Sequence, residues 1–250
     1  VNLSAALKAV KKRVLLIDID PQGNATMGSG IDKHEQPHTV YDVLVGDVSM
    51  AQAMVFSEEG KFSVLAANSD LTAAEVQLLE VEDREQRLKN AIATVADDFD
   101  YILIDCPPSL NMLTVNALTA CHGVIIPMQC EYYALEGLSS LNETIETVKA
   151  TLNPTLKIEG ILRTMYDPRM SLTGEVSAQL NTHFGEQLYH TCIPRNVRLA
   201  EAPSFGVPIL AYDKNSKGAL AYLALAGEVI KRCEPVRRKK AKAKPAAAKA

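Results

Sequence analysis

The sequence has 250 residues, of which 47% are hydrophobic and 22% charged, and its formal net charge is −4. This length allows one large α/β domain or two small ones, with ample apolar content for a core. No run approaches the roughly 18 apolar residues of a membrane span, and no secretory signal is recognised. Five cysteines without CxxC spacing favour a reduced protein that lacks a disulfide framework. We therefore expect a cytoplasmic protein without a membrane partner.

The net charge conceals an asymmetry along the chain. The last twenty residues hold nine Lys or Arg and one Glu, a charge of +8, so the other 230 residues carry −12. The end of the chain is rich in Lys, Ala and Pro and has no aromatic residue, which is typical of a disordered segment. We expect a domain over 1–232 and a basic tail over 233–250. The tail either contacts a polyanion, DNA before membrane, or is a solvated extension.

Apolar runs and apolar periodicity predict strands and helices that alternate along most of the chain. The predicted strands are Val14–Ile19, Phe62–Asn68, Tyr101–Ser109, Gly123–Cys130, Leu156–Tyr166, Leu188–Pro194 and Pro208–Asp213. The predicted helices are Val1–Val10, Ala73–Ala96, Leu110–Cys121, Ala134–Thr151, Leu172–Phe184 and Lys217–Arg232. This alternation predicts an α/β fold with a doubly wound, mostly parallel sheet between two helical layers.

Two of the apolar runs end in acidic residues. The stretch VLLIDIDPQGNAT carries Asp18 and Asp20, and YILIDCPPS carries Asp105. In open α/β sheets ligands bind beyond the carboxyl ends of the strands. Three carboxylates there repel one another unless a cation compensates, and Mg²⁺ with a bound phosphate is the natural candidate. The alternative is that each Asp caps the following turn or helix.

An ordered series of motifs resembles the ParA/Soj family of chromosome- and plasmid-partitioning ATPases, in the MinD-containing branch of the P-loop ATPases. The motifs are KRVLLIDIDPQGNAT, FDYILIDCPPSL, CEYYALEGL, TMYD and IPRNVRLAEAPSFGVPILAYD. The likeness covers about Val1 to Arg232 and leaves the basic tail outside. It implies a three-layer P-loop NTPase fold with ATP and Mg²⁺ as cofactors.

The resemblance implies roles for the three carboxylates. Asp20 matches the acid that positions the attacking water, and we expect it to be catalytic. Asp105 matches the Walker B acid, which holds magnesium directly or through water. Asp18 matches a second acid near the magnesium shell.

The resemblance also implies two nucleotide-sensing segments. The residues that match switch II are Pro107, Pro108 and Ser109. The residues that match the adenine-side contacts are Pro194 and Asn196, with Met165 nearby.

In the family, two subunits enclose two ATP molecules, and the dimer binds DNA non-specifically. The matching basic residues are Arg169 and Arg198, with Lys217 a weaker candidate, although each could be an exposed side chain without a ligand. A centromere-binding partner of the ParB/Spo0J type would stimulate hydrolysis. These relations imply a nucleoid-associated protein.

One family motif is not found. The family begins with a strand and a KGGVGKT loop whose backbone donors and lysines hold the phosphates, and this loop does not occur in the 250 residues. VNLSAALKAV matches the helix that follows the loop. We expect a sheet without its first strand, from truncation or from true loss, and little ATPase activity from these residues alone.

Two other functions stay open. A non-catalytic remnant would bind DNA or a partner through the tail and through Arg169 and Arg198. A MinD-like membrane-associated ATPase would need a C-terminal amphipathic helix with large apolar residues, and RRKKAKAKPAAAKA offers only Ala.

Overall fold

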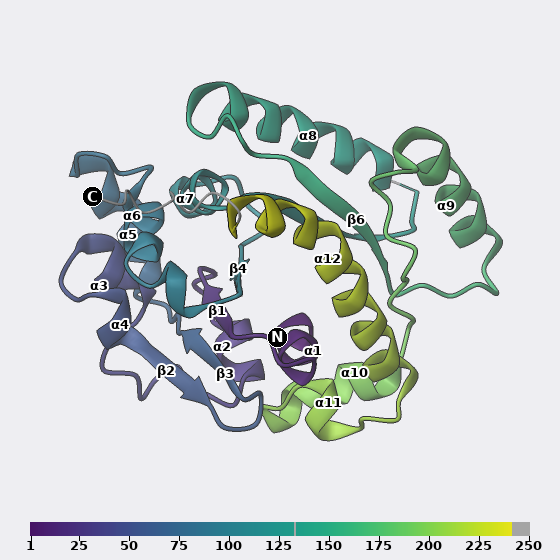
Figure 1. Ribbon diagram of the computed structural model, residues 1–250, viewed down its shortest axis with the longest axis horizontal. Helices are drawn as coiled ribbons and strands as arrows, with labels where there is room; N and C mark the ends of the chain where they lie inside the picture. Colours follow the sequence, from purple (N-terminus) through teal and green to yellow (C-terminus); the bar gives the residue numbers. More distant parts are fainter. Residues whose placement is uncertain (133, 242–250) are drawn as a thin grey trace, which may run out of the picture.

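A computed structural model describes residues 1–132 and 134–241 of the chain (Figure 1). The fold contains two β-sheets in the described residues. The first has four strands in the order β2-β3-β1-β4, and the second pairs β5 with β6. Their bounds are β1 Val14–Asp18, β2 Met54–Ser57, β3 Phe62–Leu65, β4 Tyr101–Asp105, β5 Val124–Gln129 and β6 Ile158–Thr164. All neighbouring pairs are parallel except β2 with β3.

Helices flank these strands. Their bounds are α1 Asn2–Ala9, α2 Asn24–Gly28, α3 Val40–Val45, α4 Met50–Ala53, α5 Leu71–Gln77, α6 Arg87–Ala93, α7 Met112–Ala120, α8 Ala134–Thr151, α9 Ser171–Phe184, α10 Val197–Glu201, α11 Ile209–Tyr212 and α12 Lys217–Ala241. The short 3₁₀ helices are η1 Leu78–Glu80, η2 Ala96–Asp98 and η3 Ala202–Phe205. The expected α/β/α architecture with a mostly parallel sheet is confirmed.

Strand β1 supplies both layers of the core. Its side chains alternate between the two faces of the sheet, as strand geometry requires. Leu15 and Ile17 join a cluster with α3, α5, α6 and α7. Val14 and Leu16 join a second cluster with α1 and α12, which lie side by side (Figure 1). Burial on both faces explains why this strand is apolar at every position before Asp18.

The two sheets are not hydrogen-bonded to each other within the residues that the structure describes. In the described part of the chain, β4 pairs only with β1, and β5 pairs only with β6. Strand β1 is buried throughout, whereas Tyr101–Ile104 of β4 are half-buried and Asp105 is exposed. Strand β4 is therefore an edge strand here. The expected loss of a first strand stays a prediction.

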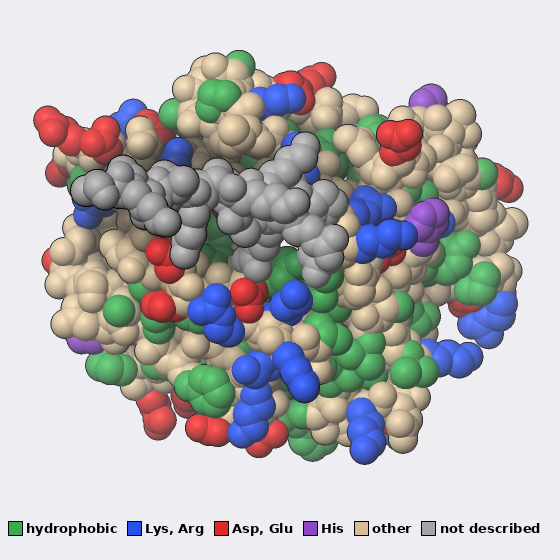
Figure 2. Space-filling view, in the orientation of Figure 1, with side chains coloured by type: hydrophobic (Ala, Val, Ile, Leu, Met, Phe, Trp, Pro, Cys, Tyr) green, Lys and Arg blue, Asp and Glu red, His purple; other side chains and the backbone are tan. Residues whose placement is uncertain are grey.

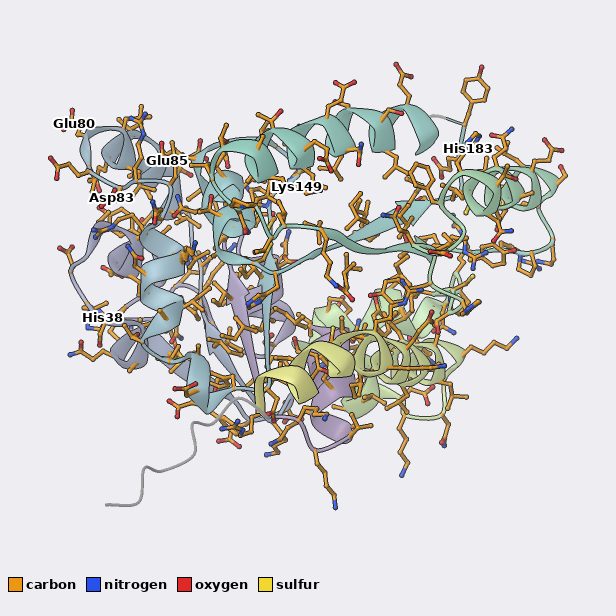
Figure 3. All side chains as sticks on the ribbon, turned by 45° about the horizontal axis from the view of Figure 1, so that its top comes forward. His38, Glu80, Asp83, Glu85, Lys149 and His183 are labelled. Carbon is orange, nitrogen blue, oxygen red and sulfur yellow. The ribbon has the colours of Figure 1, made fainter. Side chains whose placement is uncertain are left out.

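Three predicted elements are wrong. The helix expected over Ala73–Ala96 is broken into α5, η1, α6 and η2, because Val81 is extended and Asp83 has a φ of 55°. Figure 3 shows Glu80, Asp83 and Glu85 at the outer edge of the molecule near this break. The expected strand Leu188–Pro194 makes only isolated bridges. The expected strand Pro208–Asp213 forms the short helix α11 instead.

The last helix is longer than predicted. Helix α12 continues past Arg232 to Ala241, so it includes part of the segment expected to be disordered, and 242–250 lie outside the described residues. The division of the chain at residue 232 stays a prediction. No helix in the described ranges combines the length and apolarity that a membrane crossing requires.

Arg232 connects α12 to the start of β6 and to the segment at Leu188. Its guanidinium donates to the carbonyl oxygens of Glu159 (3.0 Å) and Leu188 (2.9 Å) and to the carboxylate of Glu228 (3.1 Å). It also lies 4.1 Å from the centre of the buried Tyr189 ring, a cation–π distance. One side chain therefore satisfies several polar groups at a mostly buried junction.

We predict that Arg232→Met lowers the free energy of unfolding by about 2 kcal/mol, because partly buried acceptors lose their donor and Glu228 loses its cation. Urea denaturation measures the change. The matched control is Arg169→Met, which removes an ion pair whose arginine side chain is 86% exposed and should cost less than about 1 kcal/mol. Equal losses of unfolding free energy in the two variants would contradict the role of Arg232 in holding α12 against β6.

Candidate functional site

The parallel pairing of β1 and β4 brings the predicted carboxylates to one edge of the sheet. Asp18 and Asp105 are partners in the register, and the amide of Ile19 donates to the carbonyl oxygen of Asp105 at 3.0 Å. Asp20 follows two residues after Asp18, where the chain leaves the strand. Both strands present their carboxyl ends here, which is where ligands bind in open α/β sheets.

Asp18 is fully buried and held by three hydrogen bonds. Its Oδ2 accepts from the backbone N–H and the hydroxyl of Thr26, both at 2.8 Å, and its Oδ1 accepts from the amide of Asp20 at 3.1 Å. Burial raises the pKa of Asp18, and the bonds from Thr26 and Asp20 partly oppose that rise. Both carboxylate oxygens of Asp18 thus accept hydrogen bonds from the protein itself. This arrangement suits a side chain that positions the Asp20 loop.

Asp20 and Asp105 are more accessible than Asp18. Asp20 is half-buried, and its Oδ1 accepts from the amide of Gln22 at 2.9 Å. Asp105 is exposed at the strand end, yet partial desolvation by the neighbouring protein raises the pKa of its carboxyl group. The negative charge of Asp20 adds to that rise. The edge therefore concentrates negative charge that a cation would relieve.

The carboxylates at this edge suit a Mg²⁺ ion that takes few of its ligands from the protein. Over the residues that the structure describes, no three His, Cys, Asp or Glu side chains are placed to hold a metal ion together. Mg²⁺ commonly takes one or two carboxylates and completes its shell with water and substrate phosphates. Asp105 and Asp20 fit such an ion, whereas Asp18 has less capacity because of its internal hydrogen bonds.

The loop after β4 contains the predicted switch residues. Pro107 is buried, while Pro108 and Ser109 are exposed. The carbonyl oxygen of Ser109 accepts from the hydroxyl of Thr114 at 2.7 Å, and Asn111 caps α7 by accepting from the Thr114 amide at 3.1 Å. The loop is therefore fixed at its α7 end and open to solvent before it.

A second group of predicted residues lies after β6. Tyr166 forms a parallel bridge with Pro194, which places Met165 beside the Pro194–Asn196 segment. Met165 has a φ of 50° and is 43% exposed, a combination that is uncommon for a side chain of this size. Asn196 caps α10, because its Oδ1 accepts from the Leu199 amide at 3.2 Å.

The three predicted DNA-binding residues lie on separate elements. Arg169 precedes α9 and pairs with Asp167 at 2.6 Å, and this pairing lowers the pKa of Asp167 to about 2. Arg198 on α10 pairs with Glu201 at 2.9 Å. Lys217 is exposed at the start of α12. Both arginines therefore reach solvent while paired with carboxylates of their own chain.

Sequence reasoning missed Thr26. This buried residue bonds Asp18 twice, and its hydroxyl also accepts from the amide of Ala67, just after β3, at 2.9 Å. The sequence does contain a signal for this role, because Thr26 is a hydroxyl residue that closely follows the acid in the DPQGNAT stretch.

Comparisons with known proteins match this architecture. A family model described as an AAA domain matches residues 1–158. The chain is 51% identical to the sporulation initiation inhibitor protein Soj of Bacillus subtilis, covering 92% of this chain and 90% of Soj. It is 48% identical to the chromosome partitioning protein ParA of Myxococcus xanthus, covering 94% and 83% respectively.

A solved structure is also similar. Cobyrinic acid a,c-diamide synthase from Mycobacterium smegmatis, with a bound ATP analogue and magnesium, superposes with a TM-score of 0.82 at 38% identity. The match covers 94% of this chain and 89% of that protein. Identity is thus higher to the partitioning proteins than to the synthase. The chain belongs to the ParA/Soj family of P-loop ATPases, whose cofactors are ATP and Mg²⁺.

Proposed function

We propose that the chain is the main part of a DNA-partitioning ATPase that dimerises on binding ATP. The observation that carries the proposal is the pairing of β1 with β4, which places Asp18, Asp20 and Asp105 at one edge. The family membership supports ATP hydrolysis as the reaction. Chromosome or plasmid DNA is the proposed cargo, and a ParB/Spo0J-type centromere-binding protein is the proposed stimulating partner.

Each carboxylate has a distinct proposed role. Bound Mg·ATP supplies the cation and the phosphates. Asp20, half-buried at the strand exit, orients the attacking water, and Asp105 holds magnesium directly or through water. Asp18 fixes the backbone of Asp20 through the bond from its amide. Such positioning by fixed side chains is how proteins accelerate phosphoryl transfer.

Nucleotide sensing and adenine binding are assigned to two loops. Pro107, Pro108 and Ser109 form the proposed switch II, which begins where Asp105 ends β4. Pro194 and Asn196 are the proposed adenine-side residues, and the left-handed Met165 backbone lies beside them. Backbone strain of this kind clusters at ligand sites.

DNA binding is assigned to exposed basic side chains. Arg169, Arg198 and Lys217 are the candidates, and a nucleoid-associated location would follow from their use. Lys and Arg side chains, with Asp and Glu side chains among them, also lie on the lower half of the face in Figure 2, over the part of Figure 1 that holds α1 and α11. Exposed Lys and Arg side chains suit a sequence-independent contact with phosphates.

One prediction from the proposed function concerns hydrolysis. We expect the 250 residues alone to turn over little ATP, because they contain no KGGVGKT loop. A chain extended at its start by a strand and this loop should hydrolyse ATP in the presence of Mg²⁺. In the extended chain, Asp20→Ala should lower kcat by about 100-fold or more and leave ATP binding within a few-fold.

The matched control for hydrolysis is Asp47→Ala, because Asp47 is exposed and lies on another loop. Phosphate release measures turnover, and a fluorescent ATP analogue measures binding. Robust turnover by the 250 residues, or equal turnover by the Asp20→Ala and Asp47→Ala variants, would contradict the assignment.

Another prediction from the proposed function concerns DNA. Glu201→Gln should remove the shorter ion pair of Arg198 and leave its 3.7 Å contact with Asp213. We expect binding of the extended, ATP-bound chain to a random-sequence duplex to strengthen by several-fold. Arg198→Glu should weaken binding and reduce the slope of log affinity against log salt by about 1. Fluorescence anisotropy across a salt series measures both effects.

Lys149→Glu is the control for DNA binding, because Lys149 is a paired cation on α8 (Figure 3), an element that carries none of the candidates. A salt slope that is the same in wild type and Arg198→Glu would remove Arg198 from the DNA surface.

A further inference from the structure

The turn Asp20–Gly23, just after β1, holds Asp20 by its backbone and by one carboxylate oxygen. The Asp20 amide donates to Asp18 Oδ1 at 3.1 Å, and the Asp20 carbonyl oxygen accepts from the amide of Gly23 at 2.9 Å. Its Oδ1 accepts from the amide of Gln22 at 2.9 Å. Among the described residues, no group donates to its Oδ2. The turn therefore orients the carboxylate and leaves Oδ2 available to a water molecule.

The turn is confined on both sides at Gly23. This glycine has a φ of 63°, in the left-handed region that other residues rarely adopt. A Cβ atom added to it would lie 2.6 Å from the carbonyl oxygen of Ala67, just after β3, and 2.8 Å from Cδ of Lys33. The turn thus lies between the backbone at the end of β3 and the aliphatic part of the Lys33 side chain.

The charged end of Lys33 also contacts the turn. Its Nζ donates to the carbonyl oxygen of Gln22 at 2.6 Å, and a bond from a charged donor is stronger than a neutral one. The peptide group between Gln22 and Gly23 is therefore bonded at both ends, because its N–H donates to the Asp20 carbonyl oxygen.

The surroundings of Lys33 do not explain its charge by stability alone. The residue is half-buried, and within the described part of the chain its ammonium has no carboxylate partner. Partial burial of an unpaired charge costs free energy. A methionine would provide a similar stem for packing on Gly23 without that cost, so the ammonium at this position points to a functional role.

The backbone that carries Lys33 is itself held in place. Ile31 is buried, and its amide donates to the carbonyl oxygen of Thr26 at 3.3 Å. On the other side, Oδ1 of Asp32 accepts from the amide of His34 at 2.9 Å. A side chain that positions a functional group must be supported in this way by its own surroundings.

We propose that Lys33 is a positioning residue for ATP hydrolysis, and that it holds the Asp20–Gly23 turn so that Oδ2 of Asp20 faces the attacking water. This role rests on the proposed function, in which Asp20 orients that water. Lys33 acts through the carbonyl oxygen of Gln22 and needs no contact with the nucleotide. Its loss should therefore lower kcat and leave KM nearly unchanged.

The test compares variants of the extended chain. Lys33→Met retains the aliphatic stem and removes the ammonium, and we expect kcat to fall about tenfold with KM within about twofold of wild type. Lys33→Arg retains a cationic donor and should recover most of the loss. Lys89→Met is the control, because Lys89 is exposed on α6. Equal kcat in Lys33→Met and Lys89→Met, or a loss confined to KM, would overturn the proposal.

A double-mutant cycle separates positioning of Asp20 from general damage to the fold. In the Asp20→Ala background, Lys33→Met should lower the residual kcat no further, because both changes act through the same carboxylate. A loss in this background as large as the loss in wild type would overturn the link between Lys33 and Asp20.

Hydrogen exchange provides a readout that does not depend on nucleotide. Without ATP, the amide of Gly23 should exchange faster in Lys33→Met than in wild type or Lys89→Met, while the amides of β1 keep their wild-type rates. An unchanged rate at Gly23 would overturn the proposal. An equal increase throughout β1 would also overturn it, because that pattern indicates a general loss of stability.

Failure of this role and failure of the proposed function give different results. If Asp20→Ala loses turnover and Lys33→Met retains it, only the role of Lys33 is wrong. If Asp20→Ala hydrolyses ATP as fast as wild type, the proposed role of Asp20 is wrong, and the role of Lys33 is wrong with it.

Discussion

The buried carboxylate of Asp18 is the constraint on which the candidate site depends. A charged group at this depth is strongly destabilising unless donors surround it. The donors come from the loop and helix that follow it, namely the amide of Asp20 and the two groups of Thr26. Satisfying the charge therefore dictates the path of residues 19–26 and fixes where the Asp20 side chain can lie.

The second constraint is the register between β1 and β4. Because the strands are parallel and aligned from Val14 with Tyr101 to Asp18 with Asp105, two acids distant in the sequence reach the same level. A slip of one residue would reverse the faces of β4 and move Asp105 away from that level. Packing of alternate β1 residues into two different cores opposes such a slip.

The local parts of this arrangement could be predicted from the sequence. Strand β1, helix α8 and the acid-bearing strand ends follow from apolar runs and their polar ends. The helix expected over Ala73–Ala96 failed because apolar spacing continues across Val81 and Asp83, where the backbone leaves the helical region. Apolar periodicity indicates which side chains face the core. It does not reveal a turn after which the apolar side chains still face the core.

Contacts between distant segments could not be predicted. The close approach of Gly23 to Ala67 joins residues with no local relation, and Gly23 alone is an ordinary turn signal. Pro208–Asp213 illustrates the same limit. Its apolar residues suit a strand or a helix, and the bond from the Ile209 amide to Asn2 Oδ1 at 2.8 Å, a tertiary contact, helps to fix the start of α11.

The ion pairs of Arg169 and Arg198 bear on the proposed contact with DNA. Arg169 and Arg198 are exposed and already neutralised by Asp167 and Glu201. Exposed ion pairs contribute only about 0 to 1 kcal/mol, so a phosphate can displace such a carboxylate at small cost. A single anion that replaces Asp167 or Glu201 gains little free energy, because it exchanges one ion pair for another. A polyanion with many closely spaced charges gains more, because it contacts several cations at once. The pairs thus suit a sequence-independent contact that several arginines and lysines make together.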